Sequence, residues 1–149
     1  MDSNTTHNIL ILYVSQTGTA QYISEEVARE LLKRDFVVEV KAMDDYDVTN
    51  LPNEKYVLFI AATTGSIYLF SKAITIIGQG EAPDNMKNFW KFLLIKELPS
   101  DSLSKVQFSV FGLGDSGYSK FNATARRLYQ RLLQLGAKEF HERGLGKLF

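Results

Sequence analysis

The chain contains no cysteine, and this absence removes several classes of chemistry at once. Thiol catalysis, disulfide bonds, iron–sulfur ligation and Cys-based zinc sites are all excluded. There are only two histidines, His7 and His141, which stand near opposite ends of the sequence. They form neither an HxxxH nor an HExxH ligand pair, so the sequence offers no histidine-based metal motif.

An excess of charge of either sign is also absent, because 17 Lys and Arg balance 17 Asp and Glu. Nucleic-acid binding, which needs a basic stripe, gains no support from this balance. No apolar run approaches the roughly 20 residues of a membrane span. Residues 1–8 resemble neither a signal peptide nor a transit peptide, and we expect a flexible N-terminus there. We therefore expect one cytoplasmic domain, residues 1–149, with no membrane or nucleic-acid partner.

What the sequence does contain is an alternation of apolar runs and amphipathic segments. Continuous apolar runs predict buried strands at 9–14, 36–40, 56–61 and 106–111, with a fifth strand at 138–143. Apolar residues at helical spacing predict helices at 20–34, from about 85 to 94, and at 121–135, the last closed by Gly136. The acidic, irregular residues 44–52 leave room for a short helix. This order predicts an α/β fold with a doubly wound parallel sheet.

Three loops rich in Gly, Ser and Thr follow predicted strands, at 15–20, at 62–65 continuing to 78–84, and at 112–122. In such a sheet, ligands bind beyond the carboxyl ends of the strands. In the first loop, Gly18 allows close backbone approach, and the following helix points free N–H groups at the same place. That pattern fits a phosphate site, although a Ser/Thr-rich turn that caps a helix explains it equally well. There is no GxxxxGK[ST] motif, which argues against nucleoside triphosphate hydrolysis.

The third loop allows two interpretations. Gly112, Gly114 and Gly117 match GxGxxG, which with Glu139 suggests a nicotinamide-dinucleotide site. We give this less weight, because the motif follows the fourth strand rather than the first of a βαβ pair. Tyr118 could instead stack on a planar ring system, while Phe121 is expected to begin the core face of the next helix.

Together, the segments SQTGTAQ (15–21), ATTG (62–65), PDNMKNFW (83–90) and GLGDSGYSKFN (112–122) resemble the FMN-binding, flavodoxin-like domain of the diflavin reductases. Within that family they are most similar to the type that reduces the iron–sulfur protein anamorsin in cytosolic iron–sulfur cluster assembly. The resemblance implies a five-stranded sheet of order 2-1-3-4-5. It also implies that FMN is held by Ser15, Gln16, Thr17, Gly18, Thr19, Ala20, Ala62, Thr63, Thr64, Gly65, Leu113, Gly114, Asp115, Ser116, Gly117, Tyr118, Ser119, Lys120, Phe121 and Asn122.

The same resemblance implies an electron-transfer function. Tyr118 would stack on the isoalloxazine ring, and negative charge from Asp115 and Glu81 would make the reduced flavin a stronger reductant. No catalytic side chain and no metal is required. FAD and NADPH would bind a separate C-terminal reductase module, which would be one partner, and an anamorsin-like iron–sulfur protein would be the acceptor.

Two departures from the family pattern support an alternative. A mostly apolar stretch, residues 66–78, interrupts the second loop, and removing either 66–78 or 65–77 restores ATTGQGEAPDN. The last helix of the fold is expected to be missing after residue 146. The insert could be a lid, an added strand or helix, or a defect that impairs the FMN site. The alternative is therefore a variant flavodoxin-like fragment without cofactor, acting at most as a binding module.

Overall fold

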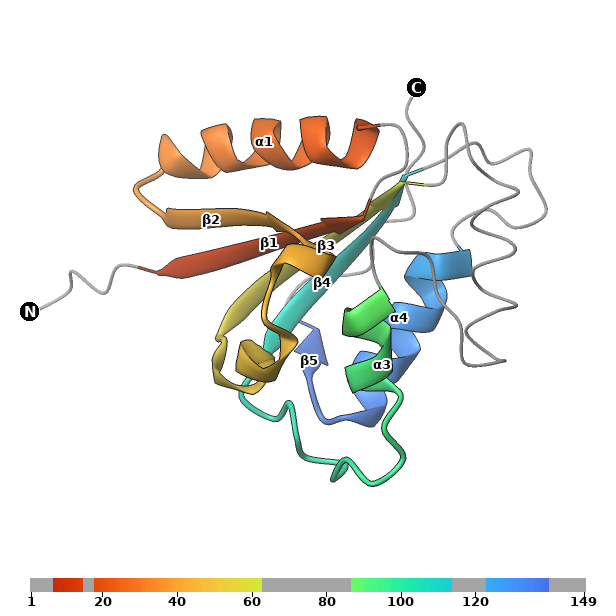
Figure 1. Ribbon diagram of the computed structural model, residues 1–149. Coiled ribbons are helices and arrows are strands. Elements are labelled where there is room, and N and C mark those ends of the chain that lie inside the picture. The colour runs from red at the N-terminus through yellow and green to blue at the C-terminus, as the bar shows by residue number, and fades with distance from the viewer. Residues whose placement is uncertain (1–6, 15–17, 63–86, 114–122, 140–149) are drawn as a thin grey trace, which may run out of the picture.

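A five-stranded parallel sheet forms the centre of the molecule in the computed structural model, which describes residues 7–14, 18–62, 87–113 and 123–139 (Figure 1). The strands lie in the order β2-β1-β3-β4-β5, and every pair is parallel. The strands are β1 (Asn8–Val14), β2 (Val37–Ala42), β3 (Tyr56–Ala62), β4 (Gln107–Leu113) and β5 (Lys138–Glu139). This arrangement confirms the predicted fold class and strand order. β1 begins at Asn8, so the last residue assigned to a flexible N-terminus belongs to the sheet.

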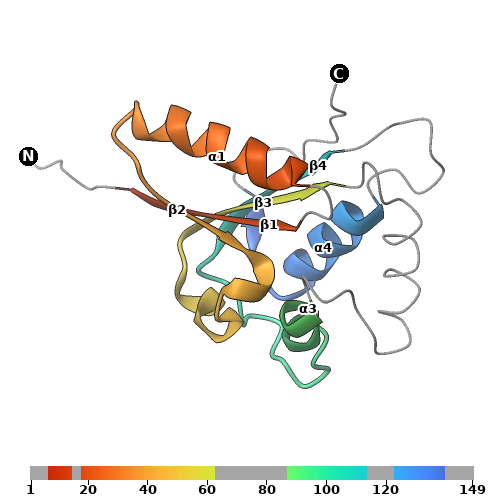
Figure 2. The same cartoon turned by 45° about the horizontal axis from the view of Figure 1, so that its top comes forward.

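One face of the sheet is covered by helix α1 (Thr19–Leu32), which packs over β1, β2 and β3 (Figures 1 and 2). Ala20, Ser24 and Ala28 recur every four residues along this helix and are all buried. Their small side chains allow the helix to approach the sheet closely. The hydroxyl of Ser24 donates to the carbonyl of Ala20 at 2.7 Å, so the buried polar atom is satisfied within the helix.

The opposite face carries the larger core. Helices α3 (Lys87–Leu93) and α4 (Ala123–Gln134) lie on it, together with the short 3₁₀ helices η1 (Met43–Asp45) and η2 (Val48–Asn53) (Figure 1). Phe59, Phe89 and Phe108 are among the largest buried side chains, and the rings of Phe59 and Phe89 meet edge to face at 5.9 Å. The acidic segment expected to hold a short helix thus forms two 3₁₀ helices.

Helix α4 ends as its sequence predicts. Gly136 adopts a left-handed conformation with φ of 91°, and its N–H donates to Leu133 while that of Ala137 donates to Leu132. The guanidinium of Arg131 donates to the carbonyls of Leu93 and Ile95, which ties α4 to the end of α3.

The helix predicted to extend to Leu94 ends one residue earlier. At this point the chain turns through hydrogen bonds from Ile95 to Phe92 and from Leu98 to Ile95, so Leu94 is 40% exposed and does not join the core. Leu94, at the predicted end of this helix, therefore lies outside both the helix and the core. The predicted helix start at 83–85, the insert at 66–78, the continuation of β5 to 143 and the region of the last helix lie outside the described residues.

Candidate functional site

The carboxyl ends of three neighbouring strands lie side by side at one edge of the sheet (Figures 1 and 2). Val14 of β1 pairs with Ala61 of β3, and Ala61 pairs with Gly112 of β4. β1 and β3 flank the point where the strand order reverses, since β2 lies on one side of β1 and β3 on the other. Open α/β sheets bind ligands in the crevice outside such a switch point.

Helix α1 starts at this same edge. Its N-cap is Gly18, with φ of 86°, and the first helical bond runs from the N–H of Tyr22 to the carbonyl of Gly18 at 2.9 Å. The N-cap residue, a glycine, offers no side chain to cap this end, and among the described residues the first turn of α1 contains no acidic residue. The free N–H groups and the positive end of the helix dipole are thus left to a ligand of negative charge.

Next to Gly18, the described residues leave room where other residues carry a side chain. A Cβ built on Gly18 meets no atom of the described residues within 4 Å. The glycine therefore leaves room next to the start of the helix, and this is the observation that fits a phosphate group to the first loop.

The structure describes five of the predicted site residues. Gly18 and Thr19 form the start of α1, Ala62 ends β3 and Leu113 ends β4, so these four backbone positions lie at the carboxyl edge of the sheet. Ala20 lies in the first turn of α1, and its side chain is fully buried in the core. Only its backbone is therefore left to contact a ligand. The remaining predicted residues, 15–17, 63–65 and 114–122, lie outside the described residues.

Glu139 does not support a nicotinamide site at residues 112–117. It pairs with Phe108 near the start of β4, whereas Leu113 ends that strand. At about 3.3 Å per residue, roughly 16 Å separate the two positions along the sheet. The Glu139 carboxylate instead accepts a hydrogen bond from the hydroxyl of Tyr129 at 3.0 Å, which gives it a role in packing α4 against β5.

Negative charge borders the strand ends on the β2 side. Tyr13, one residue before the end of β1, is half-buried, and burial together with the carboxylates of Asp45 and Glu25 raises the pKa of its hydroxyl. Asp45 belongs to η1 and Glu25 to α1, and the charges of both carboxylates act on the same hydroxyl. Nothing in the sequence marks Tyr13 or Glu25 as neighbours of the site, because the register that pairs Tyr13 with Ala42, just before η1, is a property of the folded sheet.

Metal and membrane features are not found in the described part of the chain. Within residues 7–14, 18–62, 87–113 and 123–139, no three His, Asp or Glu side chains gather closely enough to hold a metal ion. Over the same ranges, every helix is too short or too polar to cross a bilayer.

The chain is similar in sequence to a known family and to longer proteins of several organisms. A family model described as Flavodoxin matches residues 11–69 and 68–148. The chain is 50% identical over 131 residues to NADPH-dependent diflavin oxidoreductase 1 of Danio rerio, covering 88% of this chain and 20% of that protein. It is 42% identical over 139 residues to the Arabidopsis thaliana protein of the same name, covering 93% of this chain and 20% of that protein. The chain thus spans about a fifth of the length of these relatives.

Solved structures agree on the fold. The Streptococcus pneumonia TIGR4 flavodoxin superposes with a TM-score of 0.70 at 23% identity, covering 95% of this chain and 85% of that one. Oxidised flavodoxin 2 of Bacillus cereus superposes with a TM-score of 0.68 at 24% identity, covering 95% and 83%. At this identity the likeness concerns the fold alone.

Proposed function

Because the chain belongs to the flavodoxin family, we propose that it binds FMN at the carboxyl ends of β1, β3 and β4 and acts as an electron-transfer domain of a diflavin reductase. The observation that carries this proposal is the start of α1. Its glycine N-cap, with no described residue close to the position of a Cβ on Gly18, fits the FMN phosphate dianion without any basic side chain.

The chain's own residues then have positioning roles. The N–H groups of the first turn of α1, with the hydroxyls of Ser15, Thr17 and Thr19, would hold the phosphate. Residues 62–65 and 113–122 would supply the backbone that faces the isoalloxazine ring, with Tyr118 stacked on it. When bound, FMN supplies the redox chemistry, accepting electrons from one partner and passing them to another. No side chain of this domain needs to act as acid, base or nucleophile.

The partners follow from the relatives' name, NADPH-dependent diflavin oxidoreductase 1, and from the resemblance of the site segments. Electrons would enter from NADPH through an FAD-containing reductase module, which corresponds to sequence beyond this domain in the relatives. They would leave to an anamorsin-like iron–sulfur protein of cytosolic cluster assembly. We place this function in the cytoplasm.

A direct test is the flavin content of the purified protein. We expect a yellow protein that releases FMN, identified by chromatography, when it is denatured. Titration of flavin-free protein with FMN and NAD in parallel separates the flavodoxin function from a nicotinamide site at residues 112–117. A colourless protein that fails to take up added FMN would overturn the proposal.

A second candidate is a flavodoxin-like module that has lost its cofactor, and one observation favours it. The match to the family model comes in two pieces that meet at residues 68–69, inside the apolar stretch 66–78. An insertion at this place separates the two halves of the second flavin loop. If it prevents FMN binding, a variant lacking residues 66–78 should bind FMN and the unmodified chain should not.

A further inference from the structure

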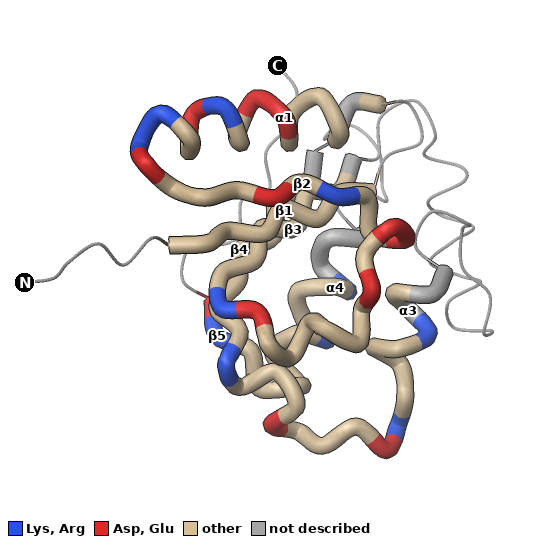
Figure 3. Tube along the Cα trace, turned by 60° about the vertical axis from the view of Figure 1, so that its left-hand side comes forward, with Lys and Arg blue, Asp and Glu red and all other residues tan. Residues whose placement is uncertain are grey.

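Three lysines gather at the end of the sheet opposite the candidate flavin site. Lys55 precedes β3, Lys105 lies in the turn before β4, and Lys138 begins β5, and all three are exposed. Two backbone hydrogen bonds bring the segments together, from Gln107 N–H to the Lys55 carbonyl at 2.7 Å and from Lys138 N–H to the Val106 carbonyl at 2.9 Å. Figure 3 shows the corresponding stretches of positive charge beside β5.

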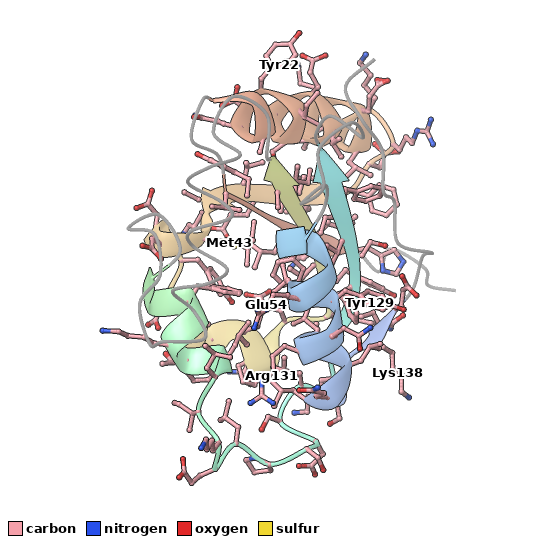
Figure 4. The ribbon with its side chains drawn as sticks, turned by 90° about the vertical axis from the view of Figure 1, so that its right-hand side faces the viewer. Tyr22, Met43, Glu54, Tyr129, Arg131 and Lys138 are labelled. Atoms are coloured by element: carbon pink, nitrogen blue, oxygen red, sulfur yellow. The ribbon has the colours of Figure 1, made fainter. Side chains whose placement is uncertain are left out.

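The carboxylates next to these lysines in sequence are engaged elsewhere. Glu54 accepts a hydrogen bond from the Tyr46 hydroxyl at 2.7 Å, and Glu139 accepts one from the Tyr129 hydroxyl at 3.0 Å. Successive residues of a strand point to opposite faces, so Lys138 and Glu139 leave β5 on opposite sides of the sheet. Figure 4 shows the Lys138 side chain pointing away from Tyr129. Both glutamates therefore turn toward tyrosines and not toward the lysines beside them.

Other lysines of this protein do have carboxylate partners. Lys33 pairs with Glu30 at 3.2 Å and Lys41 pairs with Glu39 at 3.3 Å. No ion pair within the described residues involves Lys55, Lys105 or Lys138. Like charges held together without counter-charges repel one another, and a ligand of negative charge would relieve this repulsion.

The surface between the lysines can also take part in binding. The Lys55 ammonium lies 5.3 Å from the centre of the Tyr56 ring, and Tyr56, Gln107 and Lys138 occupy neighbouring, in-register positions on one face. The Gln107 side chain is half-buried and supplies amide hydrogens between the two ends of this row. We call the four residues Lys55, Lys105, Gln107 and Lys138 the lysine rim.

We propose that the lysine rim binds a short acidic segment of a partner protein. β3 and β5 are two strand spacings apart, about 10 Å, which an extended peptide covers in about three residues. Two carboxylates at that separation could therefore meet Lys55 and Lys138 together. A longer polyanion such as RNA fits less well, because the chain has no net charge and its acidic residues would repel the rest of the strand.

This inference is independent of flavin binding. Tyr56 and Ala62 mark the two ends of β3, so about 20 Å of sheet separate the lysine rim from the candidate flavin site. A partner held at the rim would leave the flavin end of the molecule accessible to a second protein. The rim thus offers a place for a tethering contact rather than for electron transfer.

The test uses a blocked octapeptide with Glu at every third position and Ser elsewhere, carrying a fluorescent label and titrated with the whole 149-residue chain in about 50 mM salt. We expect saturable binding that weakens as salt rises. A Lys55→Gln/Lys105→Gln/Lys138→Gln variant should bind roughly tenfold more weakly, the size expected when three exposed ion pairs are lost. The matched control, Lys33→Gln/Lys41→Gln/Lys91→Gln, removes the same charge and should change affinity less than about twofold.

Three results would overturn the proposal: no saturable binding by the unmodified chain, an equal loss in both triple variants, or tighter binding of an octauridylate RNA or of phosphatidylserine vesicles than of the peptide. Amide chemical shifts of the unmodified protein provide a readout that does not depend on any variant folding. On adding peptide, the largest changes should fall at Lys55, Lys105, Gln107 and Lys138. Changes centred on another surface would equally contradict the inference.

Discussion

Gly18 and Gly136 have almost the same backbone angle but different surroundings. Their φ values are 86° and 91°, a region that costs an L-residue about 1–2 kcal/mol. A Cβ on Gly136 would lie 2.8 Å from the Ser100 carbonyl oxygen and 3.2 Å from the Asp101 Cα, whereas a Cβ on Gly18 meets no atom of the described residues within 4 Å. The two positions therefore separate backbone strain from steric overlap.

We predict that Gly136→Ala lowers the free energy of unfolding by roughly 2–4 kcal/mol, since overlap with backbone adds to the strain. Gly18→Ala should cost only about 1–2 kcal/mol, because strain acts there alone. Urea unfolding of the flavin-free proteins measures both values. Equal losses in the two variants would show that the turn at Ser100 moves to accommodate the methyl group.

Tyr46 makes the free energy of unfolding depend on pH in the alkaline range. Its side chain is buried, and burial followed by the hydrogen bond to Glu54 raises the pKa of the hydroxyl well above its usual value of 10. The folded state therefore retains a proton that the unfolded chain releases. This contribution to stability is complete below about pH 10 and is lost as the pH rises above it.

We predict that the free energy of unfolding falls as the pH rises above about 10, and that Tyr46→Phe removes part of this slope. At neutral pH the same variant should be less stable by about 1–2 kcal/mol, because Glu54 loses its donor. Tyr22→Phe is the control, since Tyr22 is 60% exposed and makes no such contact with a carboxylate. Parallel slopes in the unmodified protein and Tyr46→Phe would contradict the assignment.

At the scale of elements, α3 depends on α4 for its position. α3 is short, and the guanidinium of Arg131 on α4 donates to the carbonyl of its last residue, Leu93, and to that of Ile95 just beyond it. Short helices are marginal without tertiary contacts, so this tether helps to hold the end of α3 against α4. Arg131 thereby connects the helix after the second flavin loop to the helix after the third.

We predict that Arg131→Gln lowers the free energy of unfolding by about 1–3 kcal/mol, because two carbonyl groups lose a charged donor. Arg29→Gln provides the matched control. Arg29 pairs with Glu26 on the exposed surface of α1, where such pairs contribute less than about 1 kcal/mol. Denaturant unfolding of both variants gives the comparison, and a similar effect at the two sites would argue against a tether.

The strands could be predicted from the sequence because each central strand is buried on both faces and therefore reads as a continuous apolar run. Leu10, Ile11 and Leu12 of β1 all lie in the core, on alternating faces. The end of α3 could not be predicted from the sequence, because apolar residues continue at helical spacing beyond Leu93, where the helix ends. Leu94 is the next residue, and it is exposed. Apolar periodicity predicts which face is buried and says little about where hydrogen bonding stops.

The candidate site was predictable only in part. The position of the first loop followed from a strand, a glycine and a helix in succession. The left-handed angle of Asp35 and the combined effect of Glu25 and Asp45 on Tyr13 had no such signal, because they depend on turn geometry and strand register. The lysine rim is similar, since residues 55, 105 and 138 are distant in sequence and adjacent only through β3, β4 and β5.

At the scale of the whole molecule, the described core forms on both sides of residues 66–78. β3 ends at Ala62 and α3 begins at Lys87, and Phe59 of β3 packs directly against Phe89 of α3. Deleting the thirteen residues roughly halves the connection between them, which changes the entropy of loop closure by only about 0.7 kcal/mol. The stability of the flavin-free fold should therefore be nearly independent of the insert.

We predict that deleting residues 66–78 raises the affinity for FMN at least tenfold while the flavin-free protein unfolds within about 1 kcal/mol of the unmodified chain. Binding to the folded state alone stabilises it by RT ln(1 + [L]/Kd), so FMN at 100 times the Kd adds about 2.7 kcal/mol. Unfolding midpoints of both chains across an FMN series therefore report affinity and stability together. If the two chains bind FMN equally, the insert leaves the second flavin loop intact and serves another purpose.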